Sequence, residues 1–145
     1  MTIQRNPFAF LMLLLCLMLH GTTALAEEDE DSEATPGITD YIEMDPAFVT
    51  HVGEPSDQVT YLKAEVTLRA SAETTRPAVE AHMPRLRHEL VMLFGEQTDI
   101  DRLSSPEGQQ ALRDEALKRI NAALDAQNTG EAVTGVLFTE FVVQR

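Results

Sequence analysis

Large apolar residues recur at helical spacing between residues 76 and 94. They fall on one face of a helix, at Val79, Met83, Leu86, Leu90, Leu93 and Phe94. This pattern predicts a core-facing helix around which the rest of the domain is organised. Pro84 predicts a kink or a new helix start, because proline removes one hydrogen bond and clashes with the preceding turn. The other side presents a weakly polar face of Ala81, His88 and Met92, which favours contact with a partner.

Alternation of apolar and polar residues between residues 59 and 69 predicts a strand with one face in water. The apolar face consists of Leu62, Ala64, Val66 and Leu68. Residues 38–52 also favour extended structure, but Asp45-Pro46 interrupts them. Because proline cannot donate to a ladder, this interruption predicts an edge position or two short pieces, the second being residues 48–52. The turn residues that follow predict a hairpin with the strand at 59–69.

The last apolar segment, residues 133–143, has bulky side chains on both faces of an extended chain. One face carries Leu137, Phe141 and Val143, and the other Val136, Phe138 and Val142. This pattern predicts an inner strand, or a strand with one face covered by another chain.

A second amphipathic helix is predicted from Ser104 to about residue 128. Ser104 and Glu107 have the spacing of a capping box, and Thr75 is the predicted cap of the first helix. Its apolar face consists of Leu112, Ala116, Leu117, Ile120, Ala123 and Leu124, and its polar face pairs Asp114 with Lys118 and Glu115 with Arg119. The connection at residues 96–103 is polar. The order β-β-α-α-β predicts an α+β domain at residues 38–145, a small mixed sheet of about three or four strands covered by two amphipathic helices.

The first 26 residues have the pattern of a targeting segment. Arg5 precedes a twelve-residue apolar block, and Ala24 and Ala26 supply the small residues that signal peptidase favours. We interpret residues 1–26 as a signal peptide, with an uncleaved membrane anchor as the alternative. Residues 27–37 carry six acids in their first seven positions and are predicted to form a disordered spacer.

Charge and cysteine content exclude several classes of function. The chain has a formal net charge of -13 at pH 7, which disfavours nucleic acid and anionic lipid as partners. Its single cysteine, Cys16, lies in the apolar leader. The domain that follows the leader is therefore predicted to be neither a disulfide scaffold nor a cysteine enzyme.

The sequence lacks the motifs of common enzyme classes. The histidines outside the leader, His51, His82 and His88, do not have the i, i+3 or i+4 spacing that places two metal ligands side by side. There is no nucleophile elbow, P-loop, zinc-protease motif or dinucleotide fingerprint. We therefore predict no catalysis, no cofactor and no metal. A hydrolase whose dispersed carboxylates converge in space is the least favoured alternative.

Five segments, in order, resemble the periplasmic domain of the FliL family of flagellar basal body-associated proteins. They are residues 41–52 (YIEMDPAFVTHV), 59–68 (VTYLKAEVTL), 83–93 (MPRLRHELVML), 105–124 (SPEGQQALRDEALKRINAAL) and 136–144 (VLFTEFVVQ). We take as family-signature positions, serving the fold or an interface, Tyr41, Pro46, Phe48, Val49, Pro84, Arg87, Gly108, Leu112, Asn121, Phe138, Phe141 and Gln144.

The resemblance implies a stomatin or SPFH-like fold and a homo-oligomeric ring around the flagellar stator. It implies contact with a stator of the MotA/MotB type and with the basal body, support of rotation or swarming, and no catalysis. The implied location is the periplasmic face of the inner membrane, with membrane anchoring if the leader is retained. Two features depart from the family pattern: the leader ends in a cleavage site, and His51 stands where the family tends to have asparagine. The alternative is thus a signal-peptide-bearing paralogue, a free periplasmic binding or scaffold module not tied to the flagellum.

Overall fold

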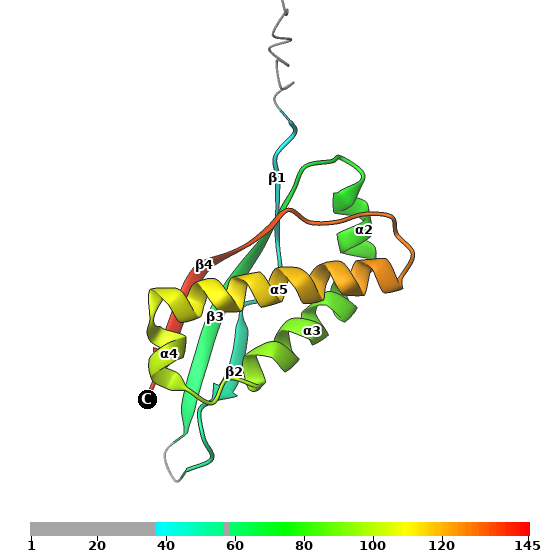
Figure 1. The fold of residues 1–145 in the computed structure, drawn as a ribbon. Coiled ribbons are helices and arrows are strands. Elements are labelled where there is room, and N and C mark those ends of the chain that lie inside the picture. The colour runs from blue at the N-terminus through cyan, green and yellow to red at the C-terminus, as the bar shows by residue number, and fades with distance from the viewer. Residues whose placement is uncertain (1–36, 57–58) are drawn as a thin grey trace, which may run out of the picture. The chain divides into compact units, whose positions relative to one another are not determined.

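The computed structural model of the chain describes residues 37–56 and 59–145, which form an antiparallel sheet and a layer of helices (Figure 1). The elements in order are β1 (Asp40–Glu43), β2 (Phe48–Val52), β3 (Thr60–Ala70), α2 (Thr75–Ala81), α3 (Met83–Gly95), α4 (Ile100–Ser104), α5 (Pro106–Ala126) and β4 (Gly135–Gln144). The predicted α+β class is confirmed. Within the described residues there are four helices where two were predicted.

Strand β3 is the centre of the sheet. Along one side it pairs with β2 and then with β1, and along the other side it pairs with β4. The predicted hairpin of β2 and β3 is confirmed, and Asp45-Pro46 divides the outer strand into two short pieces as predicted. The backbone N–H of Met44 still donates to the carbonyl of Val66 at 2.9 Å, so β1 and β2 follow one edge of β3.

The predicted mixed sheet is wrong, because every strand pairing is antiparallel. Helices α2 to α5 connect β3 to β4, and the chain re-enters the sheet beside the C-terminal end of β3. Thr134 donates its backbone N–H to the carbonyl of Arg69 at 2.7 Å, and Gly135 then pairs with Arg69 as β4 begins. The predicted inner position of β4 is also wrong within the described residues, where β4 has β3 as its one strand neighbour.

Strand β4 contains a β-bulge, which turns most of its bulky side chains to the core side. The interpretation that both faces of this strand need burial is therefore corrected. The pairing with β3 shifts by one residue at Thr139, so that Val66 pairs with Phe138 and Glu65 pairs with Glu140. A bulge residue reverses which positions face the core, because side chains alternate along a strand. The core-facing side of β4 is therefore Val136, Phe138, Phe141 and Val143, and the opposite side carries the exposed Leu137 and Val142.

The core lies between the sheet and the helices α3 and α5, which cross the same face of the sheet (Figure 1). The predicted apolar faces of α3 and α5 are buried there, with Met83 and Leu117 partly covered. Phe94 of α3 is fully buried and meets Phe48 of β2 edge-on at 5.4 Å between ring centroids and Phe138 of β4 at 6.0 Å. These three rings join the two sides of the sheet to one helix.

The ends of the helices differ in detail from the prediction. Helix α2 ends at Ala81, and α3 begins at Met83 with Pro84 in its first turn, which confirms the predicted new start. Ser105, one residue after the predicted cap, accepts the backbone N–H of Gly108 at 3.0 Å and begins α5. Thr75 does not cap α2 but lies buried in its first turn. The polar connection contains the short helix α4, which Asp99 caps by accepting the N–H of Arg102.

Candidate interaction surfaces

The sheet has an open face, which we define as the side away from α3 and α5. Five large apolar or aromatic side chains on this face are exposed, namely Tyr41 (54%), Val49 (67%), Tyr61 (41%), Leu137 (37%) and Val142 (37%). They come from all four strands, because each strand alternates between the core and this face. Such a face combines apolar area with accessibility, which suits contact with another macromolecule.

Lys63 occupies the middle of the open face. It lies in β3, opposite Val49 of β2 on one side and opposite Val142 of β4 on the other. Its ammonium donates a hydrogen bond to the Glu140 carboxylate at 2.8 Å. This hydrogen bond raises the pKa of Lys63 and lowers the pKa of Glu140. His51 packs edge-on against Tyr61 with 4.6 Å between ring centroids. Lys63 thus bonds to one of the two carboxylates beside it, because Glu65 lies opposite Glu140 on the same face.

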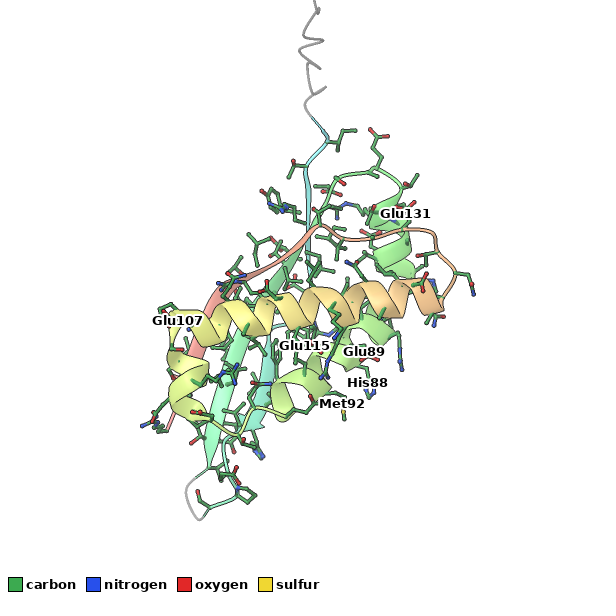
Figure 2. The ribbon with its side chains drawn as sticks, in the orientation of Figure 1. His88, Glu89, Met92, Glu107, Glu115 and Glu131 are labelled. Carbon is green, nitrogen blue, oxygen red and sulfur yellow. The ribbon has the colours of Figure 1, made fainter. Side chains whose placement is uncertain are left out.

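A second surface lies on the outer side of α2 and α3. The predicted partner-facing residues Ala81, His88 and Met92 are all exposed, and Val91 adds a further exposed apolar side chain. Figure 2 places His88 and Met92 together on the outer side of α3, near Glu89. This surface is smaller in apolar content than the open face, and the i to i+4 ion pair of Arg85 and Glu89 at 2.6 Å crosses it.

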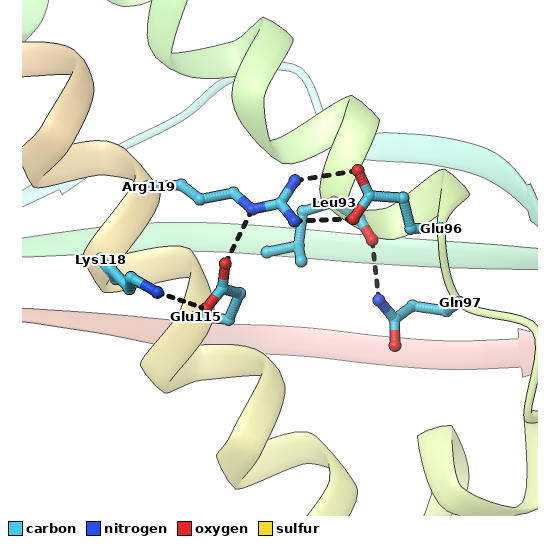
Figure 3. Close-up of polar contacts among 6 residues, drawn as sticks. All are labelled: Leu93, Glu96, Gln97, Glu115, Lys118 and Arg119. Carbon is cyan, nitrogen blue, oxygen red and sulfur yellow. Dashed lines mark hydrogen bonds and ion pairs between the residues drawn. The ribbon is translucent and has the colours of Figure 1, made fainter.

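An ion network joins the C-terminal end of α3 to the middle of α5 (Figure 3). The guanidinium of Arg119 donates to both carboxylate oxygens of Glu96, at 3.1 and 2.6 Å, and to Glu115 at 3.0 Å. The predicted pairing of Glu115 with Arg119 is confirmed, whereas Lys118 pairs with Glu115 at 3.7 Å and not with Asp114. The hydrogen bonds from Arg119 lower the pKa of Glu96, so this network holds two helices together.

Other polar contacts tie the surface loops to the core. Asn121 of α5 donates to the carbonyl of Val133 at 3.0 Å and accepts its N–H at 2.9 Å, which fixes the entry into β4. Thr75 donates its hydroxyl to Glu131 at 2.7 Å, and the hydroxyls of Thr74 and Thr75 lower the pKa of Glu131.

The start of the domain is held by Arg76. Its guanidinium donates to both carboxylate oxygens of Asp40, at 2.8 and 2.5 Å, and lowers the pKa of that carboxyl. Strand β1 is thereby fastened to α2.

The lowered carboxyl pKa values predict a loss of stability in acid. Asp40, Glu96, Glu131 and Glu140 each bind a proton less readily in the folded chain than in the unfolded chain. The stability they contribute is complete above the ordinary glutamate pKa of 4.5. It is lost as the pH falls through the lower pKa values of the folded chain. We expect the melting temperature to be level between about pH 6 and 8 and to fall below about pH 4.5.

Replacement of one network carboxylate tests this expectation. Glu96→Gln should lower the melting temperature at pH 7 by roughly 3 °C, or about 0.5 kcal/mol, a small value because half of this side chain is exposed to screening water. The difference from the parent should shrink as the pH falls through the lowered folded-state pKa of Glu96, because the parent then loses the same charge. Glu73→Gln, on an exposed turn, is the matched control. A melting temperature that rises on acidification would contradict the assignment.

Several carboxylates of the described residues lie in ion pairs and in one surface hollow. In the described part of the chain, His, Cys, Asp and Glu side chains form no group of three or more that could hold a metal ion. Glu43, Asp45 and Glu65 line a shallow hollow on the open face beside the break between β1 and β2. The carboxyls with displaced pKa values are bonded to cations or hydroxyls and are shifted downward, the opposite of what a general acid needs.

The predicted signature positions divide into two groups in the structure. Seven lie in the core or brace it, namely Phe48, Arg87, Gly108, Leu112, Asn121, Phe138 and Phe141. Arg87 belongs to this group because it donates to the carbonyl of Met44 and its guanidinium lies 4.2 Å from the centre of the Phe48 ring. The exposed group is Tyr41, Pro46, Val49, Pro84 and Gln144. Ala24 and Ala26, the predicted cleavage residues, lie outside the described residues.

Comparison with known proteins gives the family. The model of the family described as "Flagellar basal body-associated protein FliL" matches residues 41–144, which include all of the strands and helices described above except the first residue of β1. The chain belongs to the FliL family.

Individual FliL proteins agree with this assignment. The flagellar protein FliL of Aquifex aeolicus is 30% identical over 111 residues, which cover 77% of this chain and 65% of that protein. The flagellar protein FliL of Escherichia coli K12 is 29% identical over 125 residues, which cover 86% of this chain and 77% of that protein. This chain is therefore a flagellar basal body-associated protein of the FliL family, connected with motility.

The sequence predicted only part of the open face. Alternation along residues 59–69 predicted the water-facing side on which Tyr61 lies, and Tyr61 is exposed. Val142 was grouped on one face with Val136 and Phe138, and the bulge in β4 turns it to the opposite face. Among residues 37–56 and 59–145, no helix combines the length and apolar character needed to cross a bilayer.

Proposed function

We propose that this FliL protein is a non-enzymatic accessory of the flagellar motor that acts at the periplasmic face of the inner membrane and supports rotation or swarming. The observation that carries the proposal is the match to the FliL family over residues 41–144. In this proposal residues 1–26 are a signal peptide or a membrane anchor, residues 27–37 are a spacer, and residues 38–145 are the working domain.

The open face is the proposed contact with the motor. Stator units of the MotA/MotB type are the proposed partners, together with the basal body and further copies of this chain in a ring. Val49, Tyr61 and Val142 supply exposed apolar and aromatic area beside the Lys63–Glu140 ion pair. An interface centre with these properties gains free energy when water leaves it.

The first test is the location of the protein in cells with and without stator proteins. A fusion to a fluorescent protein that matures in the periplasm should give foci at flagellar bases that depend on the stator. Val49→Asp should weaken these foci without unfolding the domain, because this side chain is 67% exposed. Met92→Asp, a similar change on the outer side of α3, is the matched control and should leave them intact.

Other outcomes of this experiment have defined meanings. A uniform periplasmic signal in both strains would overturn the motor proposal. The cleavage-site pattern at Ala24 and Ala26 would then favour a free binding or scaffold module with a FliL domain. Loss of foci with Met92→Asp and not with Val49→Asp would move the motor contact from the open face to α3.

A further inference from the structure

The hollow beside the break between β1 and β2 is small and acidic. Its lining includes the carboxylates of Glu43, Asp45 and Glu65 and the hydroxyls of Thr67 and Thr139. Its volume is about 250 Å³, below the range of pockets that enclose drug-sized ligands. The hollow therefore suits the end of one side chain, and its oxygen atoms suit a group that donates hydrogen bonds.

Thr67 gives a separate indication of a ligand. It lies on the open face between Glu43 of β1 and Leu137 of β4, and only 7% of the residue is exposed. Within the described residues its hydroxyl has no hydrogen-bond partner, and it is not sealed off from the hollow that it lines. Nearly buried polar groups in proteins are as a rule hydrogen-bonded. The hydroxyl is thus available to a donor that enters the hollow.

The chain itself leaves the negative charge of the hollow largely uncompensated. Neither Glu43 nor Asp45 forms an ion pair within the described residues. Glu65 attracts Lys63, but the ammonium of Lys63 donates to Glu140 at 2.8 Å. A cation that enters the hollow therefore meets carboxylates that have no bonded cation of their own.

The spacing of the carboxylates determines which cation fits. In residues 37–56 and 59–145, acidic, histidine and cysteine side chains form no group of three or more that could hold a metal ion. The complementary cation has to spread its donors over a wider area. A guanidinium does so, because its five N–H donors lie in a rigid plane that matches carboxylate geometry. Arg87 does not fill this role, because it donates to the carbonyl of Met44 and lies over the Phe48 ring.

We propose that this hollow binds the guanidinium of an arginine side chain on a partner protein. Its N–H groups donate to the carboxylates of Glu43 and Glu65 and to the hydroxyl of Thr67. Its methylene stem lies against Leu137, which is exposed beside Thr67 on β4. The formal net charge of -13 attracts a basic partner segment. This inference rests on the proposed function, in which the open face contacts a partner, and adds the chemistry by which that partner is recognised.

Titration of the isotope-labelled full chain with short peptides tests the proposal. The probe is a capped glycine–serine peptide with one arginine, added at low ionic strength and followed through backbone amide resonances. It should shift the resonances of Glu43, Thr67 and Thr139 to saturation, with a Kd on the order of 1 mM. The same peptide with citrulline, which keeps the shape of arginine and lacks its charge, should bind at least about tenfold more weakly. A lysine peptide should bind about threefold more weakly, because an ammonium cannot bond two carboxylates in one plane.

Substitutions locate the site. Glu65→Gln should weaken binding of the arginine peptide about threefold. Thr67→Val, which keeps the shape of the side chain and removes the hydroxyl, should have an effect of similar size. Glu73→Gln removes one charge on an exposed turn and is the matched control, which should leave the binding unchanged. The amide spectrum of each variant also reports whether it is folded.

Three outcomes would overturn the proposal. They are equal binding of the citrulline or lysine peptide, equal weakening by Glu73→Gln, and shifts of the same resonances by Mg²⁺ at a lower concentration than the peptide requires. The titration uses purified protein, so its failure is distinguishable from a failure of the motor proposal, which is tested in cells.

Discussion

Replacing Gly108 with alanine is expected to destabilise the domain by about 3 kcal/mol or more, because a buried side chain would be forced against backbone. A Cβ at this position would lie 1.8 Å from the carbonyl oxygen of Arg102 and 2.7 Å from its carbonyl carbon. The obstructing atoms belong to the backbone of α4, so they cannot move aside as a flexible side chain would. The close approach of α4 to the first turn of α5 thus requires glycine.

Thermal or urea unfolding measures this effect. For a domain of this size, 3 kcal/mol corresponds to a fall in melting temperature of roughly 10–20 °C. Gly95→Ala is the matched control, since a Cβ on this helical glycine would meet no atom within 4 Å. It should leave the stability unchanged or raise it by up to about 1 kcal/mol, because alanine favours a helix more than glycine does. Equal losses in both variants would contradict the packing described for Gly108.

Deleting Thr139 is expected to destabilise the domain by about 3–6 kcal/mol, because the strand would lose the residue that aligns its two halves. Without it, strict alternation would turn either Val136 and Phe138 or Phe141 and Val143 away from the core. Burial of each such side chain contributes about 1.5–3 kcal/mol.

Thr139→Ala is the control for the deletion. It keeps the chain length and removes a hydroxyl that donates to the carbonyl of Glu65 across a long 3.4 Å, so the expected loss is about 0.5 kcal/mol or less. Unfolding curves of the two variants separate the effect of register from the effect of the threonine side chain. A deletion variant as stable as the parent would show that the two faces of β4 are interchangeable.

Predictions from sequence succeeded where one residue has a strong local effect. Pro84 begins a new helix because it lacks an N–H, and the same property of Pro46 divides the outer strand into β1 and β2. The helical apolar faces were also predicted correctly, because burial follows their periodicity.

Predictions failed where distant parts of the chain decide the structure. The bulge at Thr139 is invisible in a single strand, since it exists only relative to β3. The role of Thr75 was misjudged because its hydroxyl binds Glu131, which is 56 residues away. Helix α4 was missed because five residues are too few for a periodic signal.

The candidate surfaces were predictable to different extents. Helical spacing alone places Ala81, His88 and Met92 on the side of α2 and α3 away from the core, and all three are exposed; their role as a partner face stays a prediction. The open face requires the pairing of β3 with its neighbours, which brings Val49 and Val142 to either side of Lys63. No local pattern in the sequence joins residues that are more than 90 positions apart.

The pairing of β3 with β4 governs the order in which the domain folds. Strand β3 has β1 and β2 beside it from earlier residues, but its other side pairs with Gly135–Gln144, which follow the helices. Phe138 and Phe141 pack against the core from this strand, so that side of the core stays open until β4 joins the sheet. Pairing across such long separations is slow. A folding chain therefore passes through a state in which the helices have formed but the apolar residues under β4 are still exposed to water.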